Sequence, residues 1–320
     1  MNLPRRTLLA ATLAMPGLAR AQSFPTRPIR LLVGFAPGGA TDIVARLLQP
    51  LLGEALGQSV IVENRSGAGG MVATDFLVRA EPDGHTLMVA SPGQLVVNPL
   101  LDRNSSFDAA RDITPIGQVT SSPLVLVVPA ASPYRDARAL IEAIRARPGV
   151  MNYGSAGVGS SMHIAGEMLK AHGALSTEHV PYRGSGPAVT DLVAGKIDFM
   201  IDSVSTTATH IRNGVLRALA VTGEEPWPEF PDAVPLRSIV PDVVLTTWLG
   251  LVGPAKLPPA ILARLSDVLR DVVRSPVFTA RLKELGSQAY WAGPQDFAAF
   301  LATERQRAAD VIRRAQIRQE

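Results

Sequence analysis

The sequence predicts an α/β protein of two domains, each with a mainly parallel sheet, that face each other like the halves of a clamshell. Short apolar runs alternate with helical periodicity in two separate series, and two longer apolar stretches connect them. Glycine-rich turns stand where strands lead into helices. Such alternation is typical of parallel sheets covered on both faces, with a ligand cleft at the carboxyl ends of the strands.

The first series begins with an apolar strand at 29–34, which a helix follows at 41–56 with apolar residues every third or fourth position. A strand at 60–63, a glycine loop and a helix ending near Ala80 come next. A Pro-Asp-Gly turn then leads into a strand at 86–91. This strand–helix–strand–helix–strand order predicts one parallel sheet.

Two long apolar stretches, at 116–128 and 243–252, are predicted to cross between the domains. A second strand–helix series lies between them, and helices after Val252 return to the first domain. The predicted domains are 24–122 plus 247–320, and an inserted domain at 123–246. The two crossings form a double hinge.

The first 21 residues have the pattern of an export signal. Arg5 and Arg6 precede an apolar core, and Ala19-Arg20-Ala21 resembles a cleavage site of the A-x-A type. The apolar core is too short to span a bilayer. We expect export to the periplasm by the Sec or the twin-arginine route.

Composition excludes some classes of function. The chain has no cysteine, 31 basic and 28 acidic residues, and loss of the predicted signal removes three arginines, leaving 28 of each. The basic pI therefore gives no reason to expect nucleic acid as a partner. Any affinity for anions must come from local features such as helix ends and backbone amides.

Two glycine-rich turns have the design of anion sites. The strand ending at Gly34 runs through Pro37-Gly38-Gly39 into a helix that starts near Thr41, and a second turn spans 154–161. Glycine leaves backbone N–H groups uncovered at the positive end of a helix, where a carboxylate binds well. Two such turns predict one small acid held from two sides, although tight glycine turns also occur for structural reasons alone.

Several side chains near these turns are candidates with an alternative structural role. Asp42 would repel a carboxylate and is expected to stabilise its own loop. Ser160 and Ser161 suit a helix N-cap with spare hydroxyls, and His163 either reaches the cleft or packs within its own domain. Arg183 follows a third strand-to-helix turn and could pair with a carboxylate, or remain a solvated surface residue.

Signals for catalysis are weak. The sequence has no nucleophile elbow, zinc-protease motif or phosphate-binding loop, and its five histidines lack the spacing of metal ligands. We expect no catalytic residues, no metal and no cofactor. The enzymatic alternative is a secreted serine hydrolase that uses Ser160 or Ser161 with His163.

An ordered set of motifs resembles a known family. The chain carries PIR at 28–30, PGGATD at 37–42, VENRSGAGG at 62–70, PDG at 82–84, NP at 98–99, SAGVGS at 155–160, HVPYRG at 179–184, DLVAG at 191–195 and LRALAVT at 216–222. Each motif alone is weak, but the set resembles the periplasmic solute receptors of tripartite tricarboxylate transporters, the Bug or TctC family. The resemblance covers nearly all of the chain after the predicted signal.

This resemblance implies a Venus-flytrap fold of the periplasmic-binding-protein type and a small mono- or dicarboxylate as ligand. It also implies delivery to membrane permease subunits by a monomeric receptor; the alternative output is a signal to a membrane sensor. In the family, the loops at 35–42 and 155–161 hold one carboxylate. The full predicted ligand-binding set is Phe35, Ala36, Gly38, Gly39, Ala40, Thr41, Asp42, Ser91, Gln94, Ser155, Ala156, Gly157, Gly159, Ser160, Ser161, His163, Arg183, Asp202 and Ser203.

Two departures from the family pattern fall where the far end of the ligand is expected. The turn after Val89 reads Ser-Pro-Gly-Gln-Leu in place of the frequent Asn-Ser-Gly-Thr-His, and Ser203 follows Asp202 where asparagine is frequent. We expect Ser91, Gln94, Asp202 and Ser203 to make this end of the pocket polar and roomy. That favours a hydroxylated or dicarboxylic acid over an apolar monocarboxylate.

Overall fold

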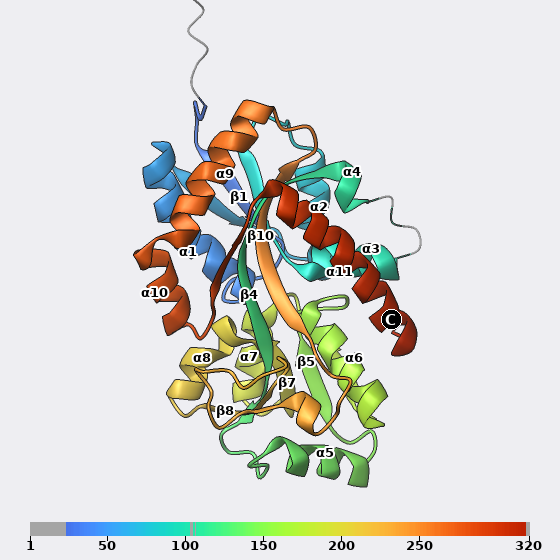
Figure 1. Cartoon of the computed structure of the whole chain (residues 1–320). Coiled ribbons are helices and arrows are strands. Elements are labelled where there is room, and N and C mark those ends of the chain that lie inside the picture. Colours follow the sequence, from blue (N-terminus) through green and yellow to red (C-terminus); the bar gives the residue numbers. More distant parts are fainter. Residues whose placement is uncertain (1–23, 103–104, 106, 318–320) are drawn as a thin grey trace, which may run out of the picture.

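The computed structural model describes residues 24–102, 105 and 107–317, and it has two lobes joined by long strands (Figure 1). The predicted signal peptide at 1–21 lies outside the described residues. Strands and helices alternate along most of the chain, so the predicted α/β class is confirmed.

The strands and helices largely follow the predicted series. In chain order they are β1 (Ile29–Val33), α1 (Ala40–Leu56), β2 (Val60–Asn64), η1 (Ala68–Gly70), α2 (Met71–Val78), β3 (Thr86–Ala90), η2 (Gly93–Val97), α3 (Asn98–Leu101), α4 (Ala109–Asp112), β4 (Ile113–Pro129), α5 (Ala137–Ala146), β5 (Asn152–Ser155), α6 (Ser161–Gly173), β6 (Glu178–Pro181), α7 (Ser185–Val193), β7 (Phe199–Ser203), α8 (Val204–Arg212), β8 (Leu216–Val221), β9 (Val234–Pro235), η3 (Leu236–Ser238), β10 (Thr246–Pro254), α9 (Pro259–Arg274), α10 (Pro276–Glu284), β11 (Ala289–Ala292) and α11 (Pro294–Arg314). Sequence reasoning missed α8 and the short elements α3, α4, β9 and β11.

Strand β4 belongs to both lobes. Its residues 113–123 pair with β10, and its residues 124–129 pair with β7 and β8. The strand order is β2-β1-β3-β10-β4-β7-β5-β6, with β11 and β8 also paired to β4. The upper lobe of Figure 1 thus contains the amino-terminal strands and the carboxyl-terminal helices, and the lower lobe contains β5 to β8.

The expectation of mainly parallel sheets is only half right. Strand β1 pairs in parallel with β2 and β3, and β5 pairs in parallel with β6 and β7. The long strands β4 and β10, however, run antiparallel to each other and to their neighbours β7 and β3. The sheets are mixed because the two strands that cross between the lobes run in opposite directions.

Each sheet is buried on both faces because alternate residues of its strands enter different cores. In the lower lobe, Leu124 and Leu126 of β4 pack toward α5 and α6, whereas Val125 and Val127 pack toward α7 and α8. Side chains of a strand alternate between its faces, so one short apolar run supplies two cores. This burial holds the carboxyl ends of the strands in place.

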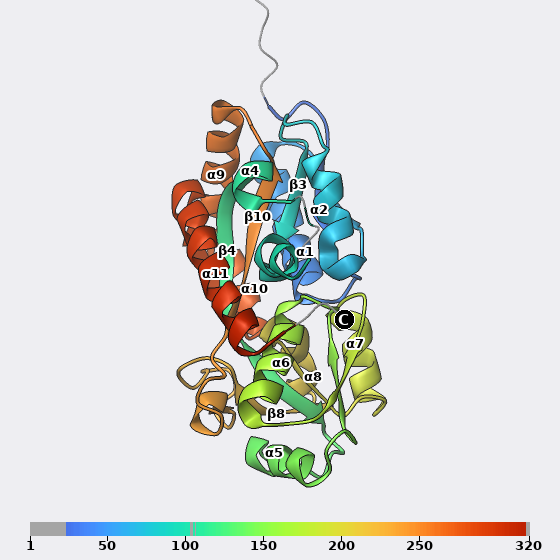
Figure 2. The same ribbon diagram turned by 90° about the vertical axis from the view of Figure 1, so that its right-hand side faces the viewer.

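The last helix, α11, runs along the upper lobe, and its end reaches the lower lobe (Figure 2). Its first half packs Phe297 and Leu301 into the upper core, beside Trp248. Its final turns carry Val311 and Ile312 onto the lower core, where Ile317 is buried. Helix α11 is therefore a further contact between the lobes, besides the paired strands.

Candidate functional site

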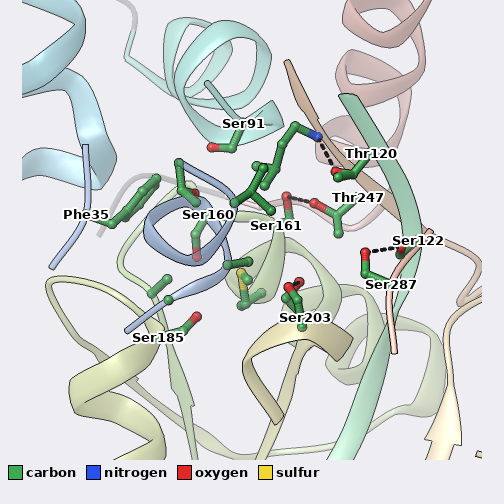
Figure 3. Close-up of a pocket in the computed structure, with 18 residues that line it drawn as sticks. Phe35, Ser91, Thr120, Ser122, Ser160, Ser161, Ser185, Ser203, Thr247 and Ser287 are labelled. Atoms are coloured by element: carbon green, nitrogen blue, oxygen red, sulfur yellow. Dashed lines mark hydrogen bonds between the residues drawn. The ribbon is translucent and has the colours of Figure 1, made fainter. Parts of the chain in front are cut away.

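A cavity lies where the two lobes meet, with a volume of about 590 Å³ including its opening (Figure 3). Eleven of its eighteen lining residues are serine or threonine. The lining consists of Phe35, Gly39, Ala40, Thr41, Val44, Ser91, Thr120, Ser122, Ala156, Ser160, Ser161, Met162, Ser185, Ser203, Ser205, Thr247, Leu249 and Ser287. None of these side chains is ionisable, so the cavity is polar without carrying formal charge on its wall.

Four helices begin at the wall of this cavity. Helix α1 comes from the upper lobe and starts after Gly39, whereas α6, α7 and α8 come from the lower lobe and start after Ser160, Gly184 and Ser203. The first turn of a helix leaves backbone N–H groups without acceptors inside the helix. Each N-terminus also carries about half a positive charge. Helix N-termini that open onto one cavity favour an anion within it.

Asp42 is tied to its own loop and does not line the cavity. Its carboxylate accepts hydrogen bonds from the Gly38 amide at 3.1 Å, Arg46 Nε at 3.0 Å and Asn64 Nδ2 at 2.9 Å. Burial opposes its ionisation, but these hydrogen bonds outweigh burial and lower the pKa of Asp42. The side chain therefore holds the glycine turn, the role expected for it from the sequence, and it also pairs with Arg46.

Two histidines stabilise the second glycine turn, residues 155–160, through hydrogen bonds. Ser155 Oγ lies 2.7 Å from His179 Nε2 and accepts the Gly157 amide at 3.0 Å. His163 Nδ1 accepts the Gly159 amide at 3.2 Å. Burial, helped by the neighbouring His179, lowers the pKa of His163 to about 4, so its imidazole is neutral near pH 7.

Asp202 is fully buried at the end of β7, behind the cavity wall. Its Oδ1 accepts the Ser185 hydroxyl at 2.8 Å and the Ser203 amide at 2.6 Å, while its Oδ2 has no hydrogen-bond partner among the described residues. Burial raises the pKa of Asp202 to about 6, against the effect of the two hydrogen bonds. This carboxyl acts on the cavity through Ser185 and Ser203, which line it.

A second cavity of about 960 Å³ lies beside the first and is open to solvent. We call it the outer cavity, and the serine-rich cavity described above the inner cavity. Phe35 and Ala156 line both cavities and so separate them. The exposed Arg183 lines only the outer cavity, and its carbonyl accepts the Ala36 amide at 2.9 Å, which joins the lobes. Arg183 therefore belongs to the wall of the outer cavity and not to that of the inner cavity.

The structure brings part of the predicted set to the inner cavity. Nine predicted residues line it: Phe35, Gly39, Ala40, Thr41, Ser91, Ala156, Ser160, Ser161 and Ser203. Gly157 and Arg183 line only the outer cavity. Eight predicted residues line neither cavity: Ala36, Gly38, Asp42, Gln94, Ser155, Gly159, His163 and Asp202.

Gln94 differs most from its predicted role. Its side-chain oxygen accepts from the Ser91 amide and hydroxyl, and its nitrogen donates to the Gly70 carbonyl at 3.3 Å. The side chain is completely buried within the upper lobe. Gln94 therefore positions Ser91 and the glycine loop around Gly70, and a role in contacting the ligand is not supported by this placement.

Nine lining residues were not predicted. They are Val44, Thr120, Ser122, Met162, Ser185, Ser205, Thr247, Leu249 and Ser287. Thr120 with Ser122, and Thr247 with Leu249, stand two residues apart on the crossing strands, and period-2 spacing puts each pair on one face. That spacing was a usable signal. Ser185 begins the helix after the third glycine turn, two residues beyond Arg183, which was the residue predicted from that turn.

Groups of acidic residues and histidines suited to a metal ion are not found in the part of the chain that the structure describes. Likewise, none of the described helices combines the length and apolarity needed to cross a membrane.

Comparison with known proteins shows what this chain resembles. Residues 44–317 match the family model described as the tripartite tricarboxylate transporter family receptor. The solved periplasmic binding protein BugD is 29% identical, with a TM-score of 0.89, over 93% of this chain and 100% of the other. The same fold recurs in two proteins from Rhodopseudomonas palustris.

One of these, Rpa4515, was solved with adipate. It is 31% identical, with a TM-score of 0.89, over 92% of this chain and 99% of the other. The second, MatC, was solved with bound malate and is 30% identical, with a TM-score of 0.86, over 90% of this chain and 100% of the other. These relatives are solute-binding proteins and not enzymes, and they share the predicted periplasmic-binding-protein fold. The chain belongs to the family of tripartite tricarboxylate transporter receptors, the TctC or Bug family.

Proposed function

We propose that this protein is an extracytoplasmic receptor that binds a small mono- or dicarboxylic acid in the inner cavity and delivers it to the permease subunits of a tripartite tricarboxylate transporter. The observation that carries the proposal is the meeting of two helix N-termini, α1 from the upper lobe and α6 from the lower lobe, at a cavity without an ionisable lining residue. Backbone amides and hydroxyls supply donors for a carboxylate, and no buried cation has to be desolvated.

Both lobes contribute to this site, so the ligand would stabilise their contact. Thr41 comes from α1, and Ser160 with Ser161 comes from the start of α6. The Ser160 hydroxyl accepts the His163 amide at 3.2 Å, which leaves its own proton free to donate into the cavity. A carboxylate between α1 and α6 would receive donors from two sides.

The fold relatives support the same ligand class, since two of them were solved with adipate and malate. The family and the signal pattern at 1–21 support export and delivery. Transfer of a signal to a membrane sensor, in place of transport, is the alternative output. The proposed domains are 24–122 plus 247–320 and 123–246; the change of partners along β4 after Pro123 supports the division.

The hydrolase alternative is disfavoured by the histidine it needs. His163 Nδ1 already accepts the Gly159 amide, and burial lowers its pKa to about 4, which makes the ring a poor proton acceptor. Ser160 uses its hydroxyl oxygen to cap α6. A nucleophile would require a hydroxyl activated by a base, which this arrangement does not supply.

The direct test is calorimetry of the purified protein, residues 22–320, against a panel of mono- and dicarboxylic acids, each paired with its neutral amide. We expect at least one acid to bind and raise the melting temperature, and its amide to bind at least tenfold more weakly. Mass spectrometry should recover the acid unchanged. Binding of amides as tight as acids, or conversion of the bound acid, would contradict the proposal.

A further inference from the structure

The hydroxyl of Ser185 has its proton committed. Ser185 lines the inner cavity at the start of α7, and Figure 3 shows it, like Ser203, on the lower-lobe side. Its hydroxyl donates to Asp202 Oδ1 at 2.8 Å. A serine hydroxyl carries one proton and two lone pairs. The Ser185 oxygen can therefore only accept a hydrogen bond from a group in the cavity.

The direction of this hydrogen bond is fixed by a second donor. The Ser203 amide donates to the same Oδ1 of Asp202 at 2.6 Å. An oxygen that accepts two donors is not the protonated oxygen of a carboxyl group, so Oδ1 is an acceptor and the proton of the Ser185–Asp202 hydrogen bond belongs to Ser185. With its pKa raised to about 6 by burial, the Asp202 carboxyl is ionised near pH 7. Asp202 is fully buried, and in the described part of the chain its Oδ2 has no hydrogen-bond partner and no cation pairs with it.

The Asp202 carboxylate makes the electrostatic potential differ between the two sides of the cavity. Asp202 lies against the first residues of both α7 and α8, so its negative charge offsets the positive ends of these two helices. Helix α6 has no acidic residue in its first turn, and the acid in the first turn of α1 is paired with Arg46. The positive side of the cavity is therefore the α1–α6 side.

From this polarity we infer that the ligand is a carboxylic acid bearing a hydrogen-bond donor, a hydroxyl or an ammonium group, which faces Ser185 while the carboxylate faces α1 and α6. The inference rests on the proposed carboxylate function and narrows its ligand class. A second carboxylate at Ser185 would meet an acceptor backed by a buried negative charge. A hydrogen-bond donor at this position satisfies the Ser185 oxygen, and its partial or full positive charge stabilises the negative charge of Asp202 behind Ser185.

The test uses acids that share one frame and differ only in a substituent. Three frames are available: propionate with lactate and alanine, succinate with malate and aspartate, and adipate with its 2-hydroxy and 2-amino derivatives. The frame whose unsubstituted acid binds best is chosen by calorimetry. We expect the hydroxy or the amino acid of that frame to bind at least tenfold more tightly than the unsubstituted acid.

Two variants separate the effect of the Ser185 oxygen on ligand preference from the effect of the Asp202 charge. S185A removes the acceptor, so the preference for the substituted acid should fall to less than threefold. In D202N the Ser203 amide still donates to the Oδ1 position, so the asparagine oxygen and not its NH₂ group must occupy it. The Ser185 hydroxyl therefore still donates to that oxygen, and its own oxygen remains an acceptor for the ligand. This variant should retain a preference for the hydroxy acid and lose a preference for the amino acid.

The control variant is T190A. Thr190 is exposed on the same helix, its hydroxyl bonds to the Gly186 carbonyl, and it does not line the cavity, so its loss should leave all ratios unchanged. Equal binding of substituted and unsubstituted acids by the wild type would overturn the inference, as would an unchanged ratio in S185A. If no acid of any frame binds, the proposed carboxylate function itself fails.

Discussion

Contact between the two lobes depends on glycines, because a side chain at these positions would collide with the other lobe. Gly159 has the closest such approach to the upper lobe. It lies in the second glycine turn with φ +76, and a Cβ built on it would lie 2.0 Å from Oδ1 of Asn98 in the other lobe. Asn98 cannot move freely, because its amide nitrogen donates to the Gly69 carbonyl at 3.1 Å. Gly159→Ala should therefore oppose the contact between the lobes.

Two costs are expected, and they act on different quantities. A left-handed backbone costs an alanine about 1–2 kcal/mol whether the lobes are together or apart, so it lowers the free energy of unfolding. The clash with Asn98 exists only when the lobes meet. Overpacking of this kind costs about 1–3 kcal/mol, which corresponds to a loss in ligand affinity of roughly 5- to 150-fold.

Two other glycines separate these costs experimentally. Gly195 has φ +72, and a Cβ added to it would meet no atom within 4 Å, so Gly195→Ala should lower stability and leave affinity unchanged. Gly93 has no positive φ, but a Cβ there would lie 3.0 Å from the Gly159 carbonyl oxygen. Gly93→Ala should weaken binding modestly with little loss of stability.

Calorimetry gives the affinity of the three variants for the acid that the wild type binds, and urea unfolding gives their stability. A Gly159→Ala variant that folds and binds as tightly as the wild type would refute the proposed clash with Asn98. It is equally refuted if Gly195→Ala loses as much affinity as Gly159→Ala, since strain alone would then explain the effect.

Three further predictions concern stability. Burial raises the pKa of Asp202 to about 6 in the folded protein, against 3.8 in the unfolded chain, so the free energy of unfolding falls as pH rises between these values. D202N has no carboxylate to bury. Its free energy of unfolding should therefore exceed that of the wild type by about 3 kcal/mol at pH 8 and show no gain below pH 4. His163 titrates near pH 4 when folded and near 6.5 when unfolded, so stability falls as pH drops through this window, and H163Q should flatten that fall in urea unfolding. Ile317→Ala should cost about 2 kcal/mol in urea unfolding because Ile317 is buried against the lower lobe, whereas Val277→Ala at an exposed site should cost under about 0.5 kcal/mol.

The architecture was predictable because apolar runs and glycine turns are local signals. The runs at 29–34 and 216–221 match β1 and β8 to within one residue. Strand direction was not predictable in the same way, because an apolar run reads the same in a parallel and an antiparallel pair. That ambiguity is why the mixed sheets around β4 and β10 could not be foreseen.

The candidate site was predictable where it is built from helix starts. Gly39, Thr41 and Ser160 follow directly from strand–glycine–helix patterns. Gln94 was predicted to contact the ligand because a buried amide that serves its own loop looks identical in sequence to one that serves a ligand. Burial decides between these roles, and burial is a property of the packed lobes.

The hydroxyls that line the cavity can be counted in the sequence, but their hydrogen-bond direction cannot. Ser122 pairs with Ser287 at 2.8 Å, and Thr247 donates to Ser161 at 3.4 Å, across 165 and 86 residues of chain. A hydroxyl whose proton is taken by such a partner can only accept from the ligand, whereas one that accepts an amide is free to donate. In a cavity without charged side chains, this pattern of committed protons contributes to selectivity, because a helix end by itself does not distinguish one carboxylate from another. The residues that set it are therefore the partners behind the wall, Asp202 foremost, as much as the serines that face the ligand.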